Sequence, residues 1–279
     1  MKYLDVSMVQ LKIIDGDVNG NLKHTSKLFL KNKFAIQNSH ITVLPELFAT
    51  GFMSEAIRKY ATKLEDSVIV NFLAKISRDY ETAIITTVPE AYGGKIYDTA
   101  VAISEGEIIG KYRKVHLFAK FGEDRIFSCG LDFSLATIEN VKIGLAICYD
   151  LRFPEIFRVE SLAGAELFVI PAAWGKKRAS HWRLLIRARA LENQAYIIGV
   201  DRVGGSNVLA EEFAGESIVA SPWGAVVAKL SSTHEEVKFV RINLVFLRKI
   251  RKEFPVLRDS KVNYYSKWYL SVSQPPPQH

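Results

Sequence analysis

Apolar runs and amphipathic stretches alternate along the whole chain of 279 residues. Short unbroken apolar runs are typical of buried strands, whereas apolar residues three and four positions apart are typical of helices with one buried face. This pattern predicts strands at residues 4–13, 40–48, 82–88, 97–103, 107–114, 141–147, 166–171, 195–203, 216–220, 225–230 and 236–243. It predicts helices at residues 20–37, at 65–80, from about Pro154 to just before Gly164, and at 180–194.

Turn and cap residues support these boundaries. The sequences Tyr92-Gly93-Gly94-Lys95 and Ser221-Pro222-Trp223-Gly224 each predict a tight turn between two strands. Pro154 suits the first turn of a helix, and Ser180 is expected to cap the helix that follows it. Because short turns alternate with longer crossover connections, we expect an α/β fold with mixed sheets and not a purely parallel one.

The chain shows no internal repeat and no linker that would divide it. We therefore expect one domain over residues 1–257 and a tail over residues 258–279. The tail is polar and ends in QPPPQH. Proline lacks a backbone N–H, so we expect no regular element there.

Charge and apolar content argue against two classes of partner. The net charge is +7, but the basic residues are spread along the chain, with short clusters only at 176–178 and 248–252. Nucleic-acid binders usually concentrate charge on one face and carry a recognisable module, so we expect no nucleic-acid partner. No run approaches the roughly 18 apolar residues of a membrane span, and the first residues show no signal-peptide pattern. We expect no membrane partner.

The cysteine and histidine content indicates a reducing compartment and no metal. Two cysteines, Cys129 and Cys148, are too few for a disulfide framework, which favours a cytoplasmic location. The six histidines lack the spacing of metal ligands. We therefore expect no cofactor.

Three segments place a reactive side chain at or just beyond the end of an apolar run. They are LPELFATGF with Glu46, GKYRKVHLF with Lys114 and GLAICYDLRFPE with Cys148. Strand ends that lead into loops are where open α/β sheets build their sites, because side chains there leave the core while the sheet fixes them.

Cys148 lies between a predicted strand and a predicted helix, the setting that presents a nucleophile on a sharp turn. The start of the helix would favour a thiolate and supply backbone N–H groups for an oxyanion. The alternative is a buried structural cysteine, since cysteine packs as a small apolar residue.

Glu46 and Lys114 suit supporting roles at such a site. A partly desolvated carboxylate accepts a proton readily and can act as a general base. A cation near a reacting carbonyl stabilises the negative charge that develops. The alternatives are a surface glutamate that ends a strand and a solvated lysine, and neither residue is specific by itself.

In this order the three segments resemble the Glu–Lys–Cys triad of the nitrilase superfamily. The motif CYDLRFPE resembles that of the amidase branches, whereas true nitrilases usually carry tryptophan after the cysteine. Similar segments, PAAW at 171–174, SHWRLLIRARALENQAYIIGVDRVG at 180–204 and GESIVASPWG at 215–224, extend the resemblance to about residue 245.

The resemblance implies a four-layer α-β-β-α sandwich that forms a homodimer or a larger homo-oligomer. Helices near the cysteine and the tail would lie at subunit contacts. It also implies catalytic roles for Glu46, Lys114 and Cys148, with Glu123 orienting the lysine. The backbone N–H of Tyr149 would join Lys114 in holding the oxyanion.

PELFATGFMSEA and the stretch from Trp174 to Gly204 are most similar to the omega-amidase branch. This similarity implies a small-molecule substrate, the ω-amide of a short dicarboxylic or 2-oxo acid. Such a substrate carries a carboxylate, for which Arg178 is the candidate partner, because a guanidinium binds a carboxylate through two parallel hydrogen bonds. A surface arginine is the alternative. Trp174 is expected to line the pocket.

Other activities stay open on the same triad. They include an amidase for deaminated glutathione, an N-carbamoyl amine hydrolase and a thiol-dependent acyltransferase. A non-catalytic protein that keeps the fold is a further alternative.

Overall fold

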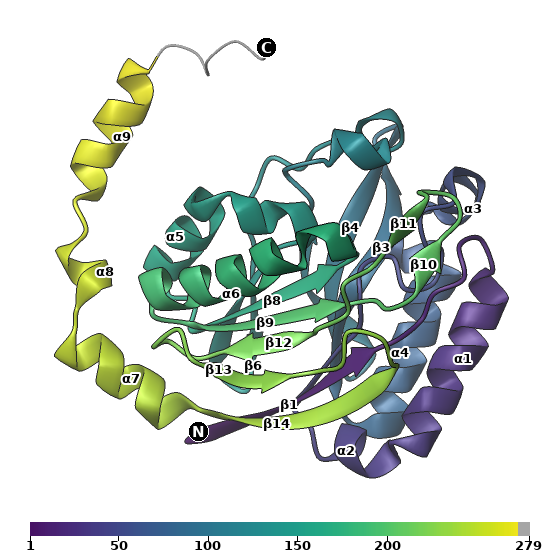
Figure 1. Cartoon of the computed structure of the whole chain (residues 1–279), viewed down its shortest axis with the longest axis horizontal. Coiled ribbons are helices and arrows are strands. Elements are labelled where there is room, and N and C mark those ends of the chain that lie inside the picture. The colour runs from purple at the N-terminus through teal and green to yellow at the C-terminus, as the bar shows by residue number, and fades with distance from the viewer. Residues whose placement is uncertain (273–279) are drawn as a thin grey trace.

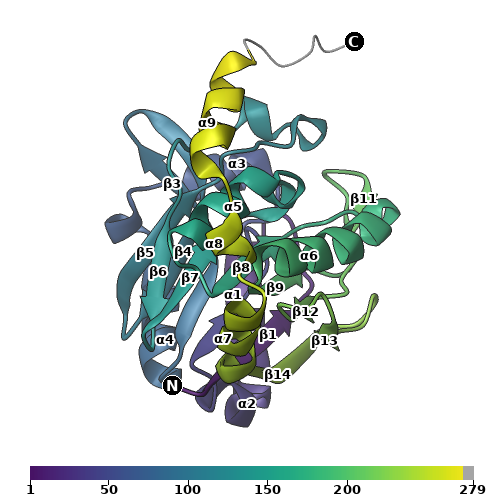
Figure 2. The same cartoon turned by 90° about the vertical axis from the view of Figure 1, so that its left-hand side faces the viewer.

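The computed structural model describes residues 1–272. Within them, two six-stranded sheets pack face to face, and helices cover the outer face of each sheet (Figures 1 and 2). The α-β-β-α sandwich expected from the resemblance is confirmed.

The first sheet has the strand order β14-β1-β2-β3-β4-β5. Strands β1, β2 and β3 run parallel, and the other pairs are antiparallel. The bounds are β14 (Glu236–Asn243), β1 (Tyr3–Gln10), β2 (Ile41–Val43), β3 (Ala83–Tyr92), β4 (Lys95–Ser104) and β5 (Glu107–Arg113).

The second sheet has the order β13-β12-β9-β8-β7-β6. Strands β7, β8 and β9 run parallel, and the outer pairs are antiparallel, so both sheets are mixed as expected. The bounds are β13 (Val226–Lys229), β12 (Ile218–Ala220), β9 (Tyr196–Asp201), β8 (Leu167–Ala172), β7 (Val141–Leu145) and β6 (Leu135–Ile138).

Side chains of one strand serve two cores because they point alternately to its two faces. On β1, Val6 and Met8 join the cluster between the sheets, whereas Val9 joins the cluster under helices α1 (Val18–Lys31) and α4 (Val68–Tyr80). Burying a side chain of this size contributes roughly 1.5–3 kcal/mol. These two apolar layers hold the four layers together.

Helices α5 (Pro154–Leu162) and α6 (Ala179–Asn193) cover the second sheet. Trp182 of α6 is fully buried against β9. A Cβ atom on Gly199 of β9 would lie 2.6 Å from the Trp182 ring. Glycine is therefore needed at this position for the helix to approach the sheet.

Three predicted boundaries are wrong. The helix expected over 20–37 is two helices, α1 and α2 (Lys33–Gln37), and they are separated at Asn32. There the backbone leaves the helical conformation, with φ −111° and ψ 26°, and the side-chain amide of Asn32 donates to the carbonyl of Leu28 at 2.9 Å. Strand β2 ends at Val43, before Pro45, so only residues 41–43 of the expected run 40–48 are strand. Helix α6 begins at Ala179 without the expected Ser180 cap.

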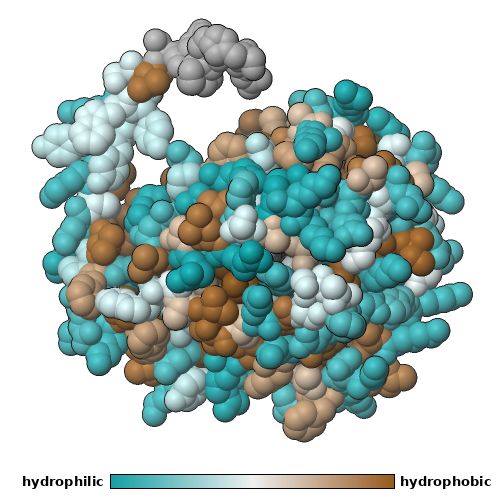
Figure 3. Space-filling model, viewed as in Figure 1, coloured by the Kyte–Doolittle hydropathy of each residue, from teal (hydrophilic) through white to brown (hydrophobic). Residues whose placement is uncertain are grey.

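The C-terminal part is helical where the sequence predicted none. It forms α7 (Leu244–Glu253), α8 (Val256–Asp259) and α9 (Val262–Ser271). Helix α9 stands off from the body at one edge, and none of its residues is buried (Figures 1 and 3). The sequence QPPPQH lies outside the described residues. In residues 1–272 no helix has the length and apolar content needed to span a membrane.

Candidate active site

The three predicted site residues follow strands of both sheets and meet at one end of the sandwich. Glu46 follows β2, Lys114 follows β5 and Cys148 follows β7. The side chains of Glu46 and Lys114 are fully buried, and Cys148 is 6% exposed. The alternatives of a surface glutamate and a solvated lysine are therefore wrong.

Lys114 is the centre of the cluster. Its Nζ donates to Glu46 Oε1 at 2.6 Å and to Glu123 Oε1 at 2.8 Å. Burial alone would lower the pKa of Lys114, but the carboxylates of Glu123 and Glu46 outweigh it and raise that pKa well above its usual value. Lys114 therefore keeps its positive charge inside the protein.

Glu46 and Glu123 are each held by a second hydrogen bond from the backbone. Glu46 Oε2 accepts from the N–H of Ala173, just after β8, at 2.9 Å, which ties this residue of the first sheet to the second. Glu123 Oε2 accepts from the N–H of Phe118 at 2.9 Å. Burial raises the pKa of Glu123 to about 7, against the opposing effect of Lys114.

Cys148 begins a short 3₁₀ turn, η4 (Cys148–Arg152), with a φ of 42°. A non-glycine residue in this left-handed region costs about 1–3 kcal/mol, so surrounding contacts must hold it. Asp150 supplies them. Its Oδ2 accepts from the N–H of Ile147 at 3.0 Å and from the hydroxyl of Tyr112 at 2.8 Å, and its Oδ1 accepts from the N–H of His116 at 2.9 Å.

The surroundings of Cys148 oppose the thiolate that a following helix was expected to favour. Burial raises the pKa of the thiol, the Glu46 carboxylate raises it further, and together they outweigh Lys114, so that the pKa lies well above its usual value. The long helix α5 begins only at Pro154, with η4 between it and the sulfur. The thiol is therefore protonated at rest and needs a base in order to react.

Asp98, on β4, is a further buried carboxyl that the sequence analysis missed. Its Oδ2 lies 4.0 Å from Lys114 Nζ, and neither oxygen has a hydrogen-bond partner within residues 1–272. Burial, and next the charge of Glu46, raise the pKa of Asp98 well above its usual value. Burial and the nearby negative charge therefore favour the protonated form of Asp98. The only signal in the sequence is an acid inside the apolar run IYDTAVAI.

A small cavity opens above the sulfur. It measures ≈ 10 Å³ and is lined by the aromatic and basic residues Phe118, Phe121, Tyr149, Arg152, Trp174 and Arg178, together with Ala173 and Gly175. A cavity of this size has room for about one water molecule. The backbone N–H of Tyr149 belongs to the first turn of η4, where N–H groups lack partners within the helix.

Trp174 and Arg178, both predicted substrate-binding residues, line this cavity. Trp174 is fixed by its backbone N–H, which donates to Asp201 Oδ1 at 2.7 Å, and by its indole N–H, which donates to the carbonyl of Arg178 at 2.8 Å. The Arg178 guanidinium donates to Glu211 Oε2 at 3.0 Å. It is therefore not simply a solvated surface arginine.

Arg152 is a second cation of the cavity wall, and the sequence analysis did not single it out. Its guanidinium lies 4.8 Å from the centre of the Trp174 ring. Within residues 1–272 no carboxylate is close enough to form an ion pair with it, in contrast to Arg178. In the same part of the chain, no group of three or more His, Cys, Asp or Glu side chains could hold a metal ion.

Residues 5–252 match the family model named Carbon-nitrogen hydrolase. The chain belongs to this family. The match confirms the resemblance to the nitrilase superfamily drawn from the three motifs.

Known relatives of this carbon–nitrogen hydrolase span nearly its whole length. An omega-amidase of Xenopus tropicalis is 32% identical over 276 residues, which cover 95% of this chain and 98% of the relative. A 2-oxoglutaramate amidase of Bacillus subtilis is 30% identical over 262 residues, or 93% and 98% of the two chains. The similarity therefore extends to the omega-amidase branch, and the chain is an amide-hydrolysing enzyme.

The fold is shared with solved structures of the same superfamily. A protein of Xanthomonas campestris, described as a CN-hydrolase superfamily protein with an arsenic adduct in its active site, matches with a TM-score of 0.85 and 28% identity. The match covers 94% of this chain and 98% of that one.

Proposed function

We propose that this hydrolase cleaves the ω-amide of a short dicarboxylic or 2-oxo acid and releases ammonia. The observation that carries the proposal is the cavity over Cys148, because its wall brings two guanidinium groups, Arg152 and Arg178, near the sulfur. A substrate with an amide at one end and a carboxylate at the other fits this arrangement. The names of the Xenopus and Bacillus relatives point to the same class.

In the proposed first half-reaction, Glu46 takes the proton of the Cys148 thiol as the sulfur attacks the amide carbon. The negative charge that develops on the amide oxygen is held by the ammonium of Lys114 and the backbone N–H of Tyr149. Glu46 then passes its proton to the nitrogen. The C–N bond breaks, ammonia leaves and a thioester remains.

Water completes the cycle in the second half-reaction. Glu46 removes a proton from the water as its oxygen attacks the thioester carbon, and the same two donors hold the oxyanion. The C–S bond then breaks, the sulfur recovers its proton from Glu46, and the acid leaves. Glu123 keeps Lys114 in place through the 2.8 Å hydrogen bond and moves no proton.

For the far end of the substrate, we propose Arg178 as the carboxylate partner, with Trp174 as a wall of the pocket. A guanidinium can bind a carboxylate through two parallel hydrogen bonds. Arg152 is the second candidate, because it lines the same cavity without an ion-pair partner in residues 1–272.

We infer that the partner of this chain is a second copy of itself, in a homodimer or a larger assembly. Helix α9 has no buried residue, yet it carries the exposed aromatic side chains of Tyr264, Trp268 and Tyr269. A short isolated helix is marginal in water, so its apolar side chains need a surface to cover. Light scattering should give at least twice the chain mass, and a monomer would contradict this inference.

We also propose a cytoplasmic location. Both cysteines are free thiols, and Cys129 is exposed. Exposed thiols persist in a reducing compartment. Fractionation of the native host cells, with the protein found in the periplasm or medium, would contradict this proposal.

The proposed substrate class is tested by ammonia release from a panel of amides. The panel contains succinamate, glutaramate, 2-oxoglutaramate, butyramide, N-carbamoyl amines, deaminated glutathione and simple nitriles. We expect the highest kcat/KM for the acidic ω-amides. Faster turnover of a carbamoyl compound or of deaminated glutathione would contradict the proposed substrate class and indicate that compound's class in its place. Hydroxamate formation with hydroxylamine in place of hydrolysis would indicate acyl transfer, and no turnover at all would favour a non-catalytic protein.

A further inference from the structure

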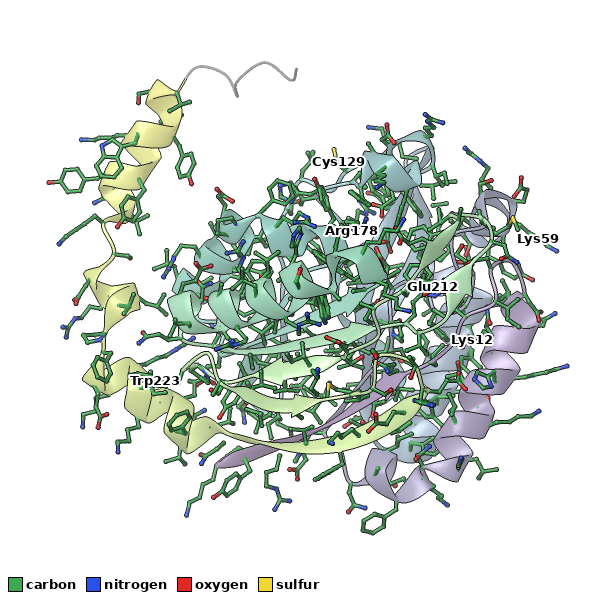
Figure 4. All side chains as sticks on the ribbon, in the orientation of Figure 1. Lys12, Lys59, Cys129, Arg178, Glu212 and Trp223 are labelled. Carbon is green, nitrogen blue, oxygen red and sulfur yellow. The ribbon has the colours of Figure 1, made fainter. Side chains whose placement is uncertain are left out.

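A small hairpin lies against the turn that carries Arg178. The hairpin consists of β10 (Gly205–Ser206) and β11 (Glu211–Glu212), and the turn is η5 (Lys176–Arg178). The backbone joins them, since Gly175 pairs with Phe213 in an isolated bridge and the N–H of Ala214 donates to the carbonyl of Trp174 at 2.8 Å. Arg178 and Glu212 mark the two elements in Figure 4.

Two ion pairs connect the hairpin with the turn, and they differ in burial. Arg178 pairs with Glu211 at 3.0 Å, and the two side chains are 17% and 10% exposed. Lys176 pairs with Glu212 at 2.7 Å, and these side chains are 53% and 68% exposed. Only Arg178 lines the cavity over Cys148, so the first pair belongs to the site and the second to the surface.

The Arg178–Glu211 pair fills the space directly over Gly175. A Cβ atom on that glycine would lie 2.2 Å from Arg178 Nη2 and 2.8 Å from Glu211 Cδ. Gly175 itself lines the cavity, which measures only ≈ 10 Å³. A substrate carboxylate that approaches Arg178 must therefore compete with a carboxylate that the protein already places there.

We propose that Glu211 is a specificity-determining residue, an internal carboxylate that occupies Arg178 in the free enzyme and is displaced by the carboxylate of the substrate. This inference rests on the proposed function, in which Arg178 binds that carboxylate. Glu211 lies beside the exposed hairpin residues Asn207, Val208 and Ala210, so its side chain can move into solvent when it is displaced.

The pairing of Arg178 with Glu211 in the free enzyme has a physical reason. Arg178 lies beside the rings of Phe118 and Phe121, with its guanidinium 5.5 and 5.7 Å from their centres. An unpaired charge in such a setting is costly, and Glu211 removes that cost when no substrate is bound. An acidic amide replaces one carboxylate with another, whereas a neutral amide gains nothing from the guanidinium. Glu211 therefore lowers the affinity for acidic substrates in exchange for a paired Arg178.

The test compares Glu211→Gln with Glu212→Gln, which removes the same charge from the neighbouring, exposed pair. KM and kcat are measured for succinamate and for butyramide. We expect Glu211→Gln to lower KM for succinamate about fivefold, the upper end for a partly exposed ion pair, with kcat within about twofold. Butyramide kinetics and the Glu212→Gln enzyme should stay at wild-type values. If Glu211→Gln does not fold, Glu211→Asp, which is shorter by one methylene, is measured with the same expectation.

Several results would overturn the proposal. An unchanged KM for succinamate means that Glu211 does not compete, and a raised KM means that it positions Arg178 for binding. If Glu211→Gln loses turnover of glutamine but not of succinamate, Glu211 binds an ammonium group of the substrate. All three leave the proposed function intact if the wild type still prefers succinamate to butyramide. A wild type without that preference overturns both the proposed function and this inference.

Discussion

The ammonium of Lys114 lies 2.6 Å from the carboxylate of Glu46, although the two residues follow different strands and neither side chain is exposed to solvent. Glu46 is also bound to the backbone of Ala173 in the second sheet. Glu46 and Lys114 both follow strands of the first sheet, whereas Ala173 and Cys148 follow strands of the second. The complete site therefore forms only when the two sheets are packed.

Replacing Lys114 with methionine should damage both activity and stability. Loss of an oxyanion donor lowers kcat on the order of hundredfold or more. Loss of the cation also leaves Glu46 and Glu123 buried without a counter-ion, which costs about 3–5 kcal/mol for a broken buried pair. Steady-state kinetics and chemical unfolding measure the two effects. Lys111→Met, which removes an exposed lysine from β5, three residues before Lys114, is the control. A Lys114→Met enzyme within twofold of wild-type kcat would place the lysine outside the chemistry.

Asp98→Asn should be tolerated, in contrast to Lys114→Met. Because burial raises the pKa of Asp98 well above its usual value, the native carboxyl is neutral, and the amide is a neutral replacement of similar shape. We expect kcat within about fivefold of wild type and equal or greater stability at neutral pH. A large fall in both would mean that Asp98 is ionised and serves as a counter-ion for Lys114.

Cys148→Ala should abolish turnover and keep the fold, since a methyl group cannot attack a carbonyl carbon. Cys129→Ala is the matched control, because Cys129 is exposed and does not line the cavity over the sulfur of Cys148. Ammonia release and thermal unfolding are measured for both variants. Undiminished release by a purified Cys148→Ala enzyme would refute the mechanism.

Glu160→Gln should change how stability depends on pH. Glu160 is buried in α5, and burial raises its pKa to about 9. The folded protein then binds a proton that the unfolded chain releases above about pH 4.5, so this contribution to stability is lost as the pH rises toward 9. The loss is about 1.4 kcal/mol per pH unit within that window. The amide does not titrate, so the advantage of the variant should grow between about pH 5 and pH 8, by as much as about 4 kcal/mol.

Unfolding curves across this pH range measure the effect. Glu155→Gln, at an exposed glutamate of the same helix, should show the pH dependence of the wild type. If Glu160→Gln also keeps that dependence, Glu160 titrates near its ordinary pKa.

The clustering of Glu46, Lys114 and Cys148 could be predicted from sequence because each residue lies at or just beyond the end of an apolar run, and the order of the three motifs indicates the family. Glu123 came from the same resemblance. Asp98 and Asp150 could not be assigned, because their importance depends on burial and on partners such as Lys114 and Tyr112 that no local pattern reveals. The same limit applies to the Cys148 thiol, since the pattern predicts a following helix that favours a thiolate but does not reveal the burial that raises the pKa of the thiol.

The predicted helix boundaries are wrong where local backbone geometry and contacts determine the end of a helix. The break lies in the backbone angles of Asn32 and in the bond from its side-chain amide to the Leu28 carbonyl, whereas the apolar periodicity continues across it. Helix α9 was missed because the expectation for the tail followed from its proline-rich end, and because none of the side chains of α9 is buried in residues 1–272.

The last prediction concerns which cation binds the carboxylate of the substrate. Arg178→Met keeps much of the apolar stem but removes the charge and its paired donors. Truncating one partner of a desolvated charge pair costs roughly 2–5 kcal/mol, so kcat/KM for succinamate should fall at least about thirtyfold. Butyramide, which has no carboxylate, should be nearly unaffected. Arg152→Met is measured in parallel, because Arg152 lines the same cavity.

In each variant, the kcat/KM for succinamate divided by that for butyramide decides the assignment. A selective loss of succinamate turnover in Arg178→Met alone supports Arg178 as the carboxylate partner. The same selective loss in Arg152→Met alone moves that role to Arg152, whose guanidinium has no acid to displace in residues 1–272. If kcat/KM falls equally for both substrates in Arg178→Met, the side chain supports the turn η5 through its ion pair with Glu211. If neither variant discriminates, the substrate is not acidic, and amide hydrolysis stands without the ω-amide assignment.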